Sequence, residues 1–151
     1  MSDLITAELL THIGSSAPPQ QEIVTRRDIR KYSVASGQRL KKYLDGDEAP
    51  PLFHVALFWD VVERDRLRPD GISIDTLIPQ LPLKRAMAGG LKIEYHRGIY
   101  PEDILIAERV LISLYEKTGR QGPLIFYEVV MTVTTITGEP VLTETTKRLL
   151  R

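Results

Sequence analysis

The chain has 151 residues, which is enough for one domain with a single substantial core and too few for two domains of ordinary size. Its 20 Lys and Arg residues balance its 20 Asp and Glu residues, so no overall field would attract nucleic acid or an anionic membrane. Cysteine is absent from the sequence, which excludes disulfides, thiolate metal sites and thiol nucleophiles.

The N-terminal sequence MSDLITAELL has neither the basic start nor the long apolar run of a signal peptide. No stretch approaches the roughly 20 apolar residues that a membrane span needs. We therefore expect a soluble, cytoplasmic protein. No two histidines have metal-ligand spacing and the acidic residues are scattered, so the sequence predicts no metal site.

The first part of the chain has the periodicity of helices. Residues 3–13 place apolar side chains at helical spacing, which predicts a short amphipathic helix. A brief strand is expected over residues 20–25. Thr25, with Asp28 three residues later, has the form of a capping box that opens a helix, and Gly37 is its expected end.

A strongly apolar stretch, APPLFHVALFWDVV, follows these helices. Its prolines fit the first turn of a helix, and Leu52 through Val62 are almost all apolar. The pattern predicts a helix over 52–62 that is buried on most sides. Residues 63–90 then have no stable period, and a connection of this length is typical of a functional segment or one that covers another subunit.

Beyond residue 90 the pattern changes to the period of two that is typical of strands. Four strands are predicted in succession: LKIEYHRGI, DILIAERVLISLYEKT, PLIFYEVVMTVTTIT and PVLTETTKRLL. They predict an antiparallel meander, and strands of about 14 residues, or ~45 Å, have to coil around something. The apolar helix over 52–62 is the candidate. The expected fold is therefore α+β, a hot-dog in which a coiled antiparallel sheet wraps a central apolar helix, as one domain over 1–151.

Several short segments resemble one family. PPLFHVALFW, MAGG, EYHR and EKTGRQGPLIF are similar to the N-terminal half of MaoC-like hydratases and dehydratases, in particular type-2 hydroxyacyl-thioester dehydratases and mesaconyl-type CoA hydratases. The resemblance covers roughly residues 20–150. It implies a double hot-dog, made of one long chain or two short ones, that adds water to, or removes it from, acyl thioesters of CoA or acyl carrier protein.

The same resemblance points to the place where the family carries its acid–base pair. That motif has the form Tyr-Ala-x-x-Ser-Gly-Asp-x-Asn-Pro-(Ile/Leu)-His-x-Asp, and YSVASGQRLKKYLD matches it at Tyr32, Ser36, Gly37 and Asp45. Gln38 stands at the aspartate position and Tyr43 at the histidine position. Glutamine does not titrate, and a tyrosine with a pKa of about 10 is a poor base at neutral pH.

Three functions remain open on this sequence. The first is a noncatalytic, substrate-binding hot-dog subunit, paired with a catalytic MaoC-like chain that carries the Asp and His. The second is a self-sufficient homodimeric hydratase or dehydratase that has moved its base to His54 or His96. The third is a module that binds acyl thioesters without chemistry. Hydration of crotonyl-CoA by the purified chain alone would favour the second, and a hydratase gene of similar length beside this one would favour the first.

The expected contacts with the thioester are glycines, aromatic side chains and cations. Residues 88–90 (AGG) and 118–122 (TGRQG) are expected to be turns, in which glycine lets the backbone approach a pantetheine arm. The substrate-binding candidates are Gly89, Gly90, Tyr95, His96, Arg97 and Arg120, while Arg39, Lys41 and Lys42 are further candidates for the phosphates of CoA or an acidic carrier protein. No cofactor is expected apart from CoA or phosphopantetheine as part of the substrate.

Overall fold

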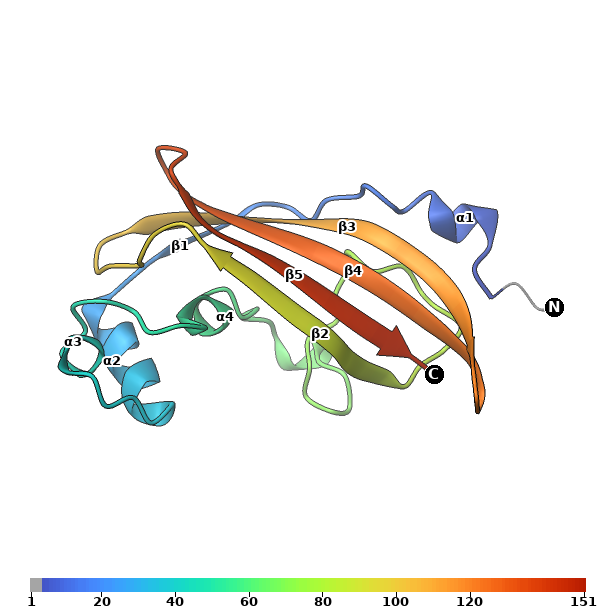
Figure 1. Ribbon diagram of the computed structural model, residues 1–151, viewed down its shortest axis with the longest axis horizontal. Coiled ribbons are helices and arrows are strands. Elements are labelled where there is room, and N and C mark those ends of the chain that lie inside the picture. Colours follow the sequence, from blue (N-terminus) through green and yellow to red (C-terminus); the bar gives the residue numbers. More distant parts are fainter. Residues whose placement is uncertain (1–3) are drawn as a thin grey trace.

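A computed structural model describes residues 4–151 of the chain. Figure 1 shows a long, curved sheet; the helices that follow the first strand lie beneath one of its ends, and the N-terminal helix lies at the other end. In chain order the elements are α1 (Ala7–Leu10), β1 (Gln20–Ile23), α2 (Arg26–Ala35), α3 (Lys41–Leu44), α4 (Phe53–Leu57), the 3₁₀ helix η1 (Arg64–Arg66), β2 (Ala86–Tyr95), β3 (Ile104–Gly119), β4 (Gly122–Thr135) and β5 (Pro140–Leu150). This coiled antiparallel sheet with helices on one face confirms the predicted α+β, hot-dog class.

The five strands lie in the order β1-β3-β4-β5-β2. β3, β4 and β5 form the predicted meander, and the hairpin between Gly119 and Gly122 confirms the expected turn in TGRQG. The prediction that all four long strands follow one another was wrong for β2, which pairs with β5 and not with β3. The reason lies at the other edge of the sheet, where β1 already occupies the free side of β3.

The glycines of AGG lie inside a strand. β2 begins at Ala86, so the prediction of a turn at 88–90 was wrong. The pairing register with β5 shifts between Ala88 and Gly90, which marks a bulge. A Cβ at Gly89 would come within 3.0 Å of the Lys147 side chain, so glycine allows the two strands to close up at this point.

The Thr25 N-cap of the predicted capping box is confirmed, while the Asp28 carboxylate accepts from the Thr25 hydroxyl at 2.7 Å. The Thr25 hydroxyl accepts a hydrogen bond from the Asp28 backbone N–H at 3.1 Å and opens α2, and Gly37 follows the end of that helix with a φ of 72°. The helix expected over residues 3–13 is only one turn long, α1, and its expected first residue lies outside the described part of the chain. Leu4, Ile5 and Leu9 nevertheless pack against the core, whereas Ile13, at the end of the expected helix, is 40% exposed.

The apolar stretch 52–62 forms a helix only from Phe53 to Leu57, so the prediction of a continuous helix was wrong in length. Phe53 and His54 are buried, whereas Trp59 and Val61 are 58% and 99% exposed. The aromatic and β-branched residues after Leu57 have low helix propensity, and although Phe58 still packs against the core, Trp59 and Val61 face solvent, which explains the early end.

An irregular segment therefore covers the part of the sheet that a longer central helix would have covered. Leu77 packs against Leu111 and Val129, and Leu81 packs against Leu114 and Ile125. A second core lies beneath the helices, where Phe53 joins buried side chains of α2, β3, β4 and β5, namely Ile29, Leu105, Ala107, Met131, Val133 and Leu142.

The two edges of the sheet differ. The free edge of β3 is covered by β1 and then by residues 14–17, which bond to the strand from Gly14 N to Leu111 O at 2.7 Å and from Ala17 N to Arg109 O at 3.0 Å. Within residues 4–151, β2 pairs with β5 alone, and Leu91 and Tyr95 on it are about half exposed. The β2 edge is thus the one at which a further chain could pair.

Candidate functional site

Two hollows adjoin His54. The first, which we call the end pocket, has a volume of about 280 Å³ and lies where α3, α4 and the end of β2 meet; its lining includes Tyr43, His54, Tyr95, His96 and Arg97. The second, which we call the sheet cavity, has a volume of about 250 Å³ and lies between strands β3–β5 and the segment after α4. His54 lines both, so this one side chain stands between them.

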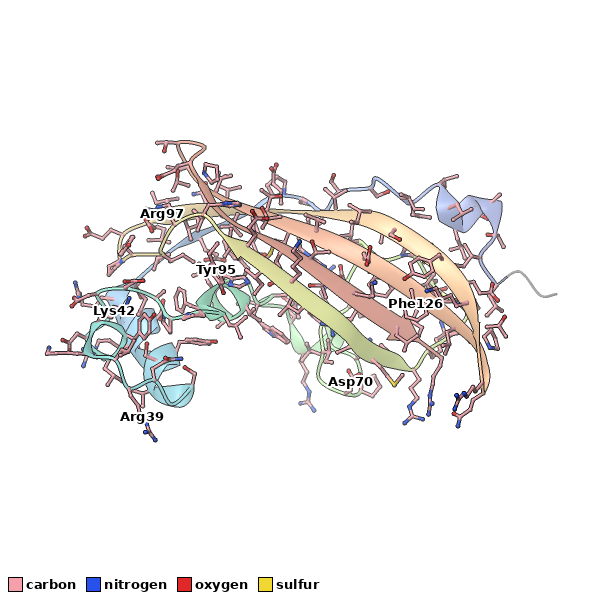
Figure 2. All side chains as sticks on the ribbon, viewed as in Figure 1. Arg39, Lys42, Asp70, Tyr95, Arg97 and Phe126 are labelled. Atoms are coloured by element: carbon pink, nitrogen blue, oxygen red, sulfur yellow. The ribbon has the colours of Figure 1, made fainter. Side chains whose placement is uncertain are left out.

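Five of the predicted site residues gather in the end pocket. Tyr43, His54, Tyr95, His96 and Arg97 all line it. Figure 2 shows Tyr95 and Arg97 near the end of the sheet under which the helices lie.

Three other predicted contacts lie elsewhere. Gly89 and Gly90 are at the bulge near the start of β2, and Arg120 is in the turn between β3 and β4. Gln38 lines neither hollow; its side-chain amide lies 3.5 Å from the Ser36 hydroxyl in the turn after α2.

Tyr95 connects β2 to the start of α4. Its hydroxyl accepts a hydrogen bond from the Leu52 backbone N–H at 3.1 Å, and Leu52 has the left-handed φ of 68° that is unusual for a branched residue. Its ring meets that of His54 edge to face, with 6.3 Å between centroids. These contacts fix the wall of the end pocket and the position of His54 at once.

Arg97 is held by acidic side chains. Its guanidinium donates two hydrogen bonds to the Asp103 carboxylate, at 2.9 and 3.0 Å, and Glu139 lies 3.7 Å away. The hydrogen bonds to Asp103 raise the pKa of Arg97, so this group keeps its charge. Because its bidentate fork is already used, Arg97 shapes the pocket more than it offers a free cation to a phosphate.

His54 and Glu144 form a buried imidazole–carboxylate pair. The His54 Nε2–H donates to Glu144 Oε2 at 2.6 Å, and Thr146 donates to the other carboxylate oxygen at 3.0 Å. Burial alone would raise the pKa of Glu144, but the hydrogen bonds from His54 and Thr146 outweigh it and hold the pKa below its usual range. His54 is fully buried, and its Nδ1 has no hydrogen-bond partner among the residues that the structure describes.

The sheet cavity has a polar wall. Arg109 on β3 bonds to Asp75 at 2.6 Å, which ties the segment after α4 to the sheet. Tyr127 on β4 points to the same hollow, and burial raises the pKa of its phenol. Trp59, the one tryptophan of the chain, also lines the cavity. A ligand here would meet both aromatic surface and hydrogen-bonding groups.

The sequence analysis missed Glu144, Arg109, Asp75 and Tyr127. A signal was present for Arg109, because it interrupts an otherwise apolar strand in DILIAERVLISLYEKT. Glu144 lies among threonines, where strand periodicity does not reveal that it meets a histidine 90 positions earlier in the chain. Only the pairing of β5 with its neighbours places its side chain beneath α4.

Neither of the two histidines that line the end pocket forms an exposed acid–base pair with a carboxylate. His54 has one nitrogen on Glu144 and the other enclosed, and His96 is exposed with a long contact of 3.3 Å to the Thr143 hydroxyl. Across residues 4–151, no three His, Asp or Glu side chains gather as metal ligands. None of the helices in the same range is long and apolar enough to span a bilayer.

Comparison with known proteins identifies the family of the chain. The family described as FAS1-like, dehydratase domain region, matches residues 11–144. Over 81 residues the chain is 32% identical to the mesaconyl-C(4)-CoA hydratase of Chloroflexus aurantiacus, and this alignment covers 53% of the chain and 29% of that protein. The matched region is thus less than a third of the relative's length.

Solved structures give the same fold at low sequence identity. The complex of ChsH1 and ChsH2 from Mycobacterium tuberculosis contains a chain that superposes with a TM-score of 0.70 at 16% identity, over 95% of this chain and 87% of that one. A MaoC-like dehydratase from Phytophthora capsici superposes with a TM-score of 0.69 at 19% identity, over 97% of this chain and 50% of that one. The chain thus corresponds in fold to half of the longer dehydratase.

Proposed function

Since the chain belongs to the MaoC-like hot-dog dehydratase family, matching the FAS1-like dehydratase domain region over residues 11–144, we propose that it is one subunit of an acyl-thioester hydratase or dehydratase. In that reaction the oxygen of water joins the β carbon of an enoyl thioester and a proton joins the α carbon, or the reverse occurs. The substrate would be carried on CoA or on acyl carrier protein.

We assign this chain the noncatalytic, substrate-binding role. The observation that carries the assignment concerns the two positions of the family's acid–base motif. Tyr43, at the histidine position, lines the end pocket, whereas Gln38, at the aspartate position, lies outside the pocket. General acid–base catalysis needs a group that exchanges protons near neutral pH within hydrogen-bonding reach of the substrate. Neither side chain meets that requirement, so the partner chain would supply the pair.

The sheet cavity is the proposed place for the acyl group. It exists because α4 ends at Leu57 and leaves the concave face of the sheet to an irregular segment. Trp59 and Met131 offer apolar contact there, whereas Tyr127 and Thr146 offer hydroxyls. An acyl chain that enters past the end pocket would therefore meet a cavity that tolerates polar substituents.

A self-sufficient enzyme is the second candidate, and the His54–Glu144 pair is the observation that favours it. A carboxylate that orients an imidazole is a common arrangement for a general base. Full burial of His54 argues against this role, because a base has to reach the α carbon or a bound water. To act, the imidazole would have to leave Glu144 or open Nδ1 to the end pocket.

We also expect the chain to associate. The open β2 edge and the exposed Trp59 are features that isolated monomers seldom leave uncovered. The partner in this proposal is a second copy or, for activity, a catalytic MaoC-like chain. Light scattering at micromolar concentration tests the claim, and a stable monomer of 17.1 kDa for the chain alone and no complex with a catalytic chain would contradict it.

Activity of the reconstituted complex tests which of the two chains is catalytic. The chain alone, a catalytic MaoC-like chain alone and the two co-expressed would be assayed for hydration of crotonyl-CoA. We expect turnover only when the catalytic chain is present, with faster turnover or tighter substrate binding in the complex. Turnover by this chain alone that is abolished in His54→Asn, with the fold intact, would establish the second candidate instead.

Binding can be tested apart from activity. Butyryl-CoA has no double bond to hydrate, and Trp59 is the one tryptophan, so its fluorescence reports occupation of the sheet cavity. We expect butyryl-CoA to change the Trp59 emission and free CoA to change it much less, because only the acyl group reaches the cavity. Equal responses to both ligands would place the acyl group elsewhere.

A further inference from the structure

The cations of the helical end are unevenly paired. Residues 26–48 contain seven Lys and Arg residues and four Asp and Glu residues. Three of the acids take one cation each: Asp47 pairs with Arg26, Asp45 with Lys41, and Glu48 with Lys42 at 2.9 Å. The fourth, Asp28, belongs to the cap of α2. The acids that balance this region in the sequence are therefore all engaged.

Four cations of the same region have no ion pair within residues 4–151, and all four are exposed. They are Arg27, Arg30 and Lys31 on α2, and Arg39 in the turn that follows it. We call this set the α2 basic face. Exposed lysine and arginine side chains are common on proteins and often serve only solubility, so a binding role has to be argued from their arrangement.

The three helical cations share one side of α2. At about 3.6 residues per turn, positions 27, 30, 31 and 34 fall within roughly a third of the helix circumference. Ile29 and Ser33 are fully buried on the other side. The fourth position on the outward side is Val34, which is 69% exposed, and Leu40 beside Arg39 is 56% exposed. The face is thus a cationic surface with two apolar side chains in it.

The shape of the face suits a macromolecule better than a small phosphate. A bound phosphate needs cations that converge on it, but Arg27, Arg30 and Arg39 line none of the hollows described above. Figure 2 shows Arg39 directed away from the body of the protein. The outward side of α2 from residue 27 to 34 is about 10 Å long, so its cations spread over a convex surface.

The position of the face connects it to the end pocket. α3 follows α2 directly, packs against it, and supplies Tyr43 to the pocket wall. Lys42, beside Tyr43, is paired with Glu48, so the pocket entrance itself has less free positive charge than the face next to it. A partner held on α2 would therefore lie beside the pocket without filling it.

We propose that the α2 basic face, with Val34 and Leu40, is a docking surface for an acidic carrier protein that presents its thioester to the end pocket. The inference rests on the proposed function and selects the protein-bound thioester over CoA as the preferred substrate form. Complementary charge would speed association and set the orientation, while Val34 and Leu40 supply the apolar contact that keeps the carrier in place.

The test compares two double charge reversals. Arg27→Glu/Arg30→Glu alters the basic face, and Arg64→Glu/Arg66→Glu makes the same change in net charge at exposed arginines of η1. The probes are acyl carrier protein bearing a butyryl thioester, with affinity measured by fluorescence anisotropy, and butyryl-CoA, followed by Trp59 emission. Glutamate has nearly the helix propensity of arginine, and circular dichroism would verify that α2 persists.

We expect Arg27→Glu/Arg30→Glu to weaken carrier binding by about tenfold or more at low salt, and the η1 pair by less than about threefold. Binding of butyryl-CoA should change little in either variant, and carrier binding by the unaltered chain should weaken as salt rises. Equal losses in the two variants, unchanged carrier binding in the α2 variant, or tighter binding to a short RNA than to the carrier would overturn the docking proposal. A folded chain that binds neither thioester would overturn the proposed function as well.

Discussion

The two halves of the apolar stretch 52–62 have the same kind of side chains and opposite surroundings. Phe53 is 2% exposed and meets Tyr32 of α2 edge to face at 5.7 Å between centroids, inside the core beneath the helices. Trp59 is 58% exposed and lines the sheet cavity. Apolarity alone therefore does not decide burial in this protein. The first half stabilises the fold, and the second half leaves apolar surface for a ligand or a partner.

The difference between the two halves should be largest in the stability that is lost when a side chain is truncated to alanine. Phe53→Ala should lower the free energy of unfolding by about 3–5 kcal/mol, because it leaves a cavity in a closed core. Trp59→Ala should cost less than about 1 kcal/mol, because most of the ring is already in water. Urea denaturation of both variants measures the two values. Similar costs at the two positions would mean that the segment after Leu57 is packed as tightly as α4.

The next largest effect is expected at the buried pair in the first half of the stretch. Glu144→Gln keeps the shape of the side chain but removes the charge that accepts the His54 and Thr146 hydrogen bonds. Hydrogen bonds to a charged group contribute roughly 1–3 kcal/mol, so this variant should lose about that much stability. Glu139→Gln, at an exposed glutamate near Arg97, is the matched control and should lose much less. Equal losses would show that the buried pair contributes no more to stability than the exposed Glu139 does.

The same pair should give stability a pH dependence. The pKa of Glu144 is lower in the folded chain than its usual value near 4.3, so its contribution is fully present above that pH. It is lost as the pH falls below about 4.3 and through the folded-state pKa. Urea midpoints measured from pH 6 downward should fall more steeply for the unaltered protein than for Glu144→Gln. Parallel curves would contradict the lowered pKa.

Local sequence signals predicted the elements that local chemistry determines. The Thr25–Asp28 cap, the end of α2 near Gly37 and the hairpin at Gly119–Gly122 all depend on a few adjacent residues, and the structure confirms them. The alternation of apolar residues also revealed the long strands, because it directly reports which sides of a strand are buried.

The errors concern interactions that the local pattern does not contain. Periodicity does not say which strand is a neighbour, and it could not reveal that β1 blocks the edge of β3 and leaves β2 to pair with β5. Apolarity over 52–62 could not show that the stretch leaves the core after Phe58 and exposes Trp59 and Val61. In the site, the resemblance to a known motif found Tyr43 and Gln38, whereas Glu144 required the three-dimensional pairing of β5 beneath α4.

The smallest effects are expected at Tyr43 and Gln38, the two positions that replace the family's acid–base pair. Tyr43 shares the end pocket with His54, and Gln38 lies outside it with one weak contact to Ser36. Replacing either with Ala should change kcat of the reconstituted complex by less than about tenfold, because loss of a positioned acid or base typically costs about 100-fold or more. Tyr43→Phe should change it least, since the ring that forms the pocket wall is kept. The measurement is kcat with crotonyl thioester at saturating substrate, together with light scattering to verify that the complex is intact. A collapse of kcat in Tyr43→Phe with the assembly preserved would mean that the phenol acts on the substrate, and the noncatalytic assignment of this chain would be wrong.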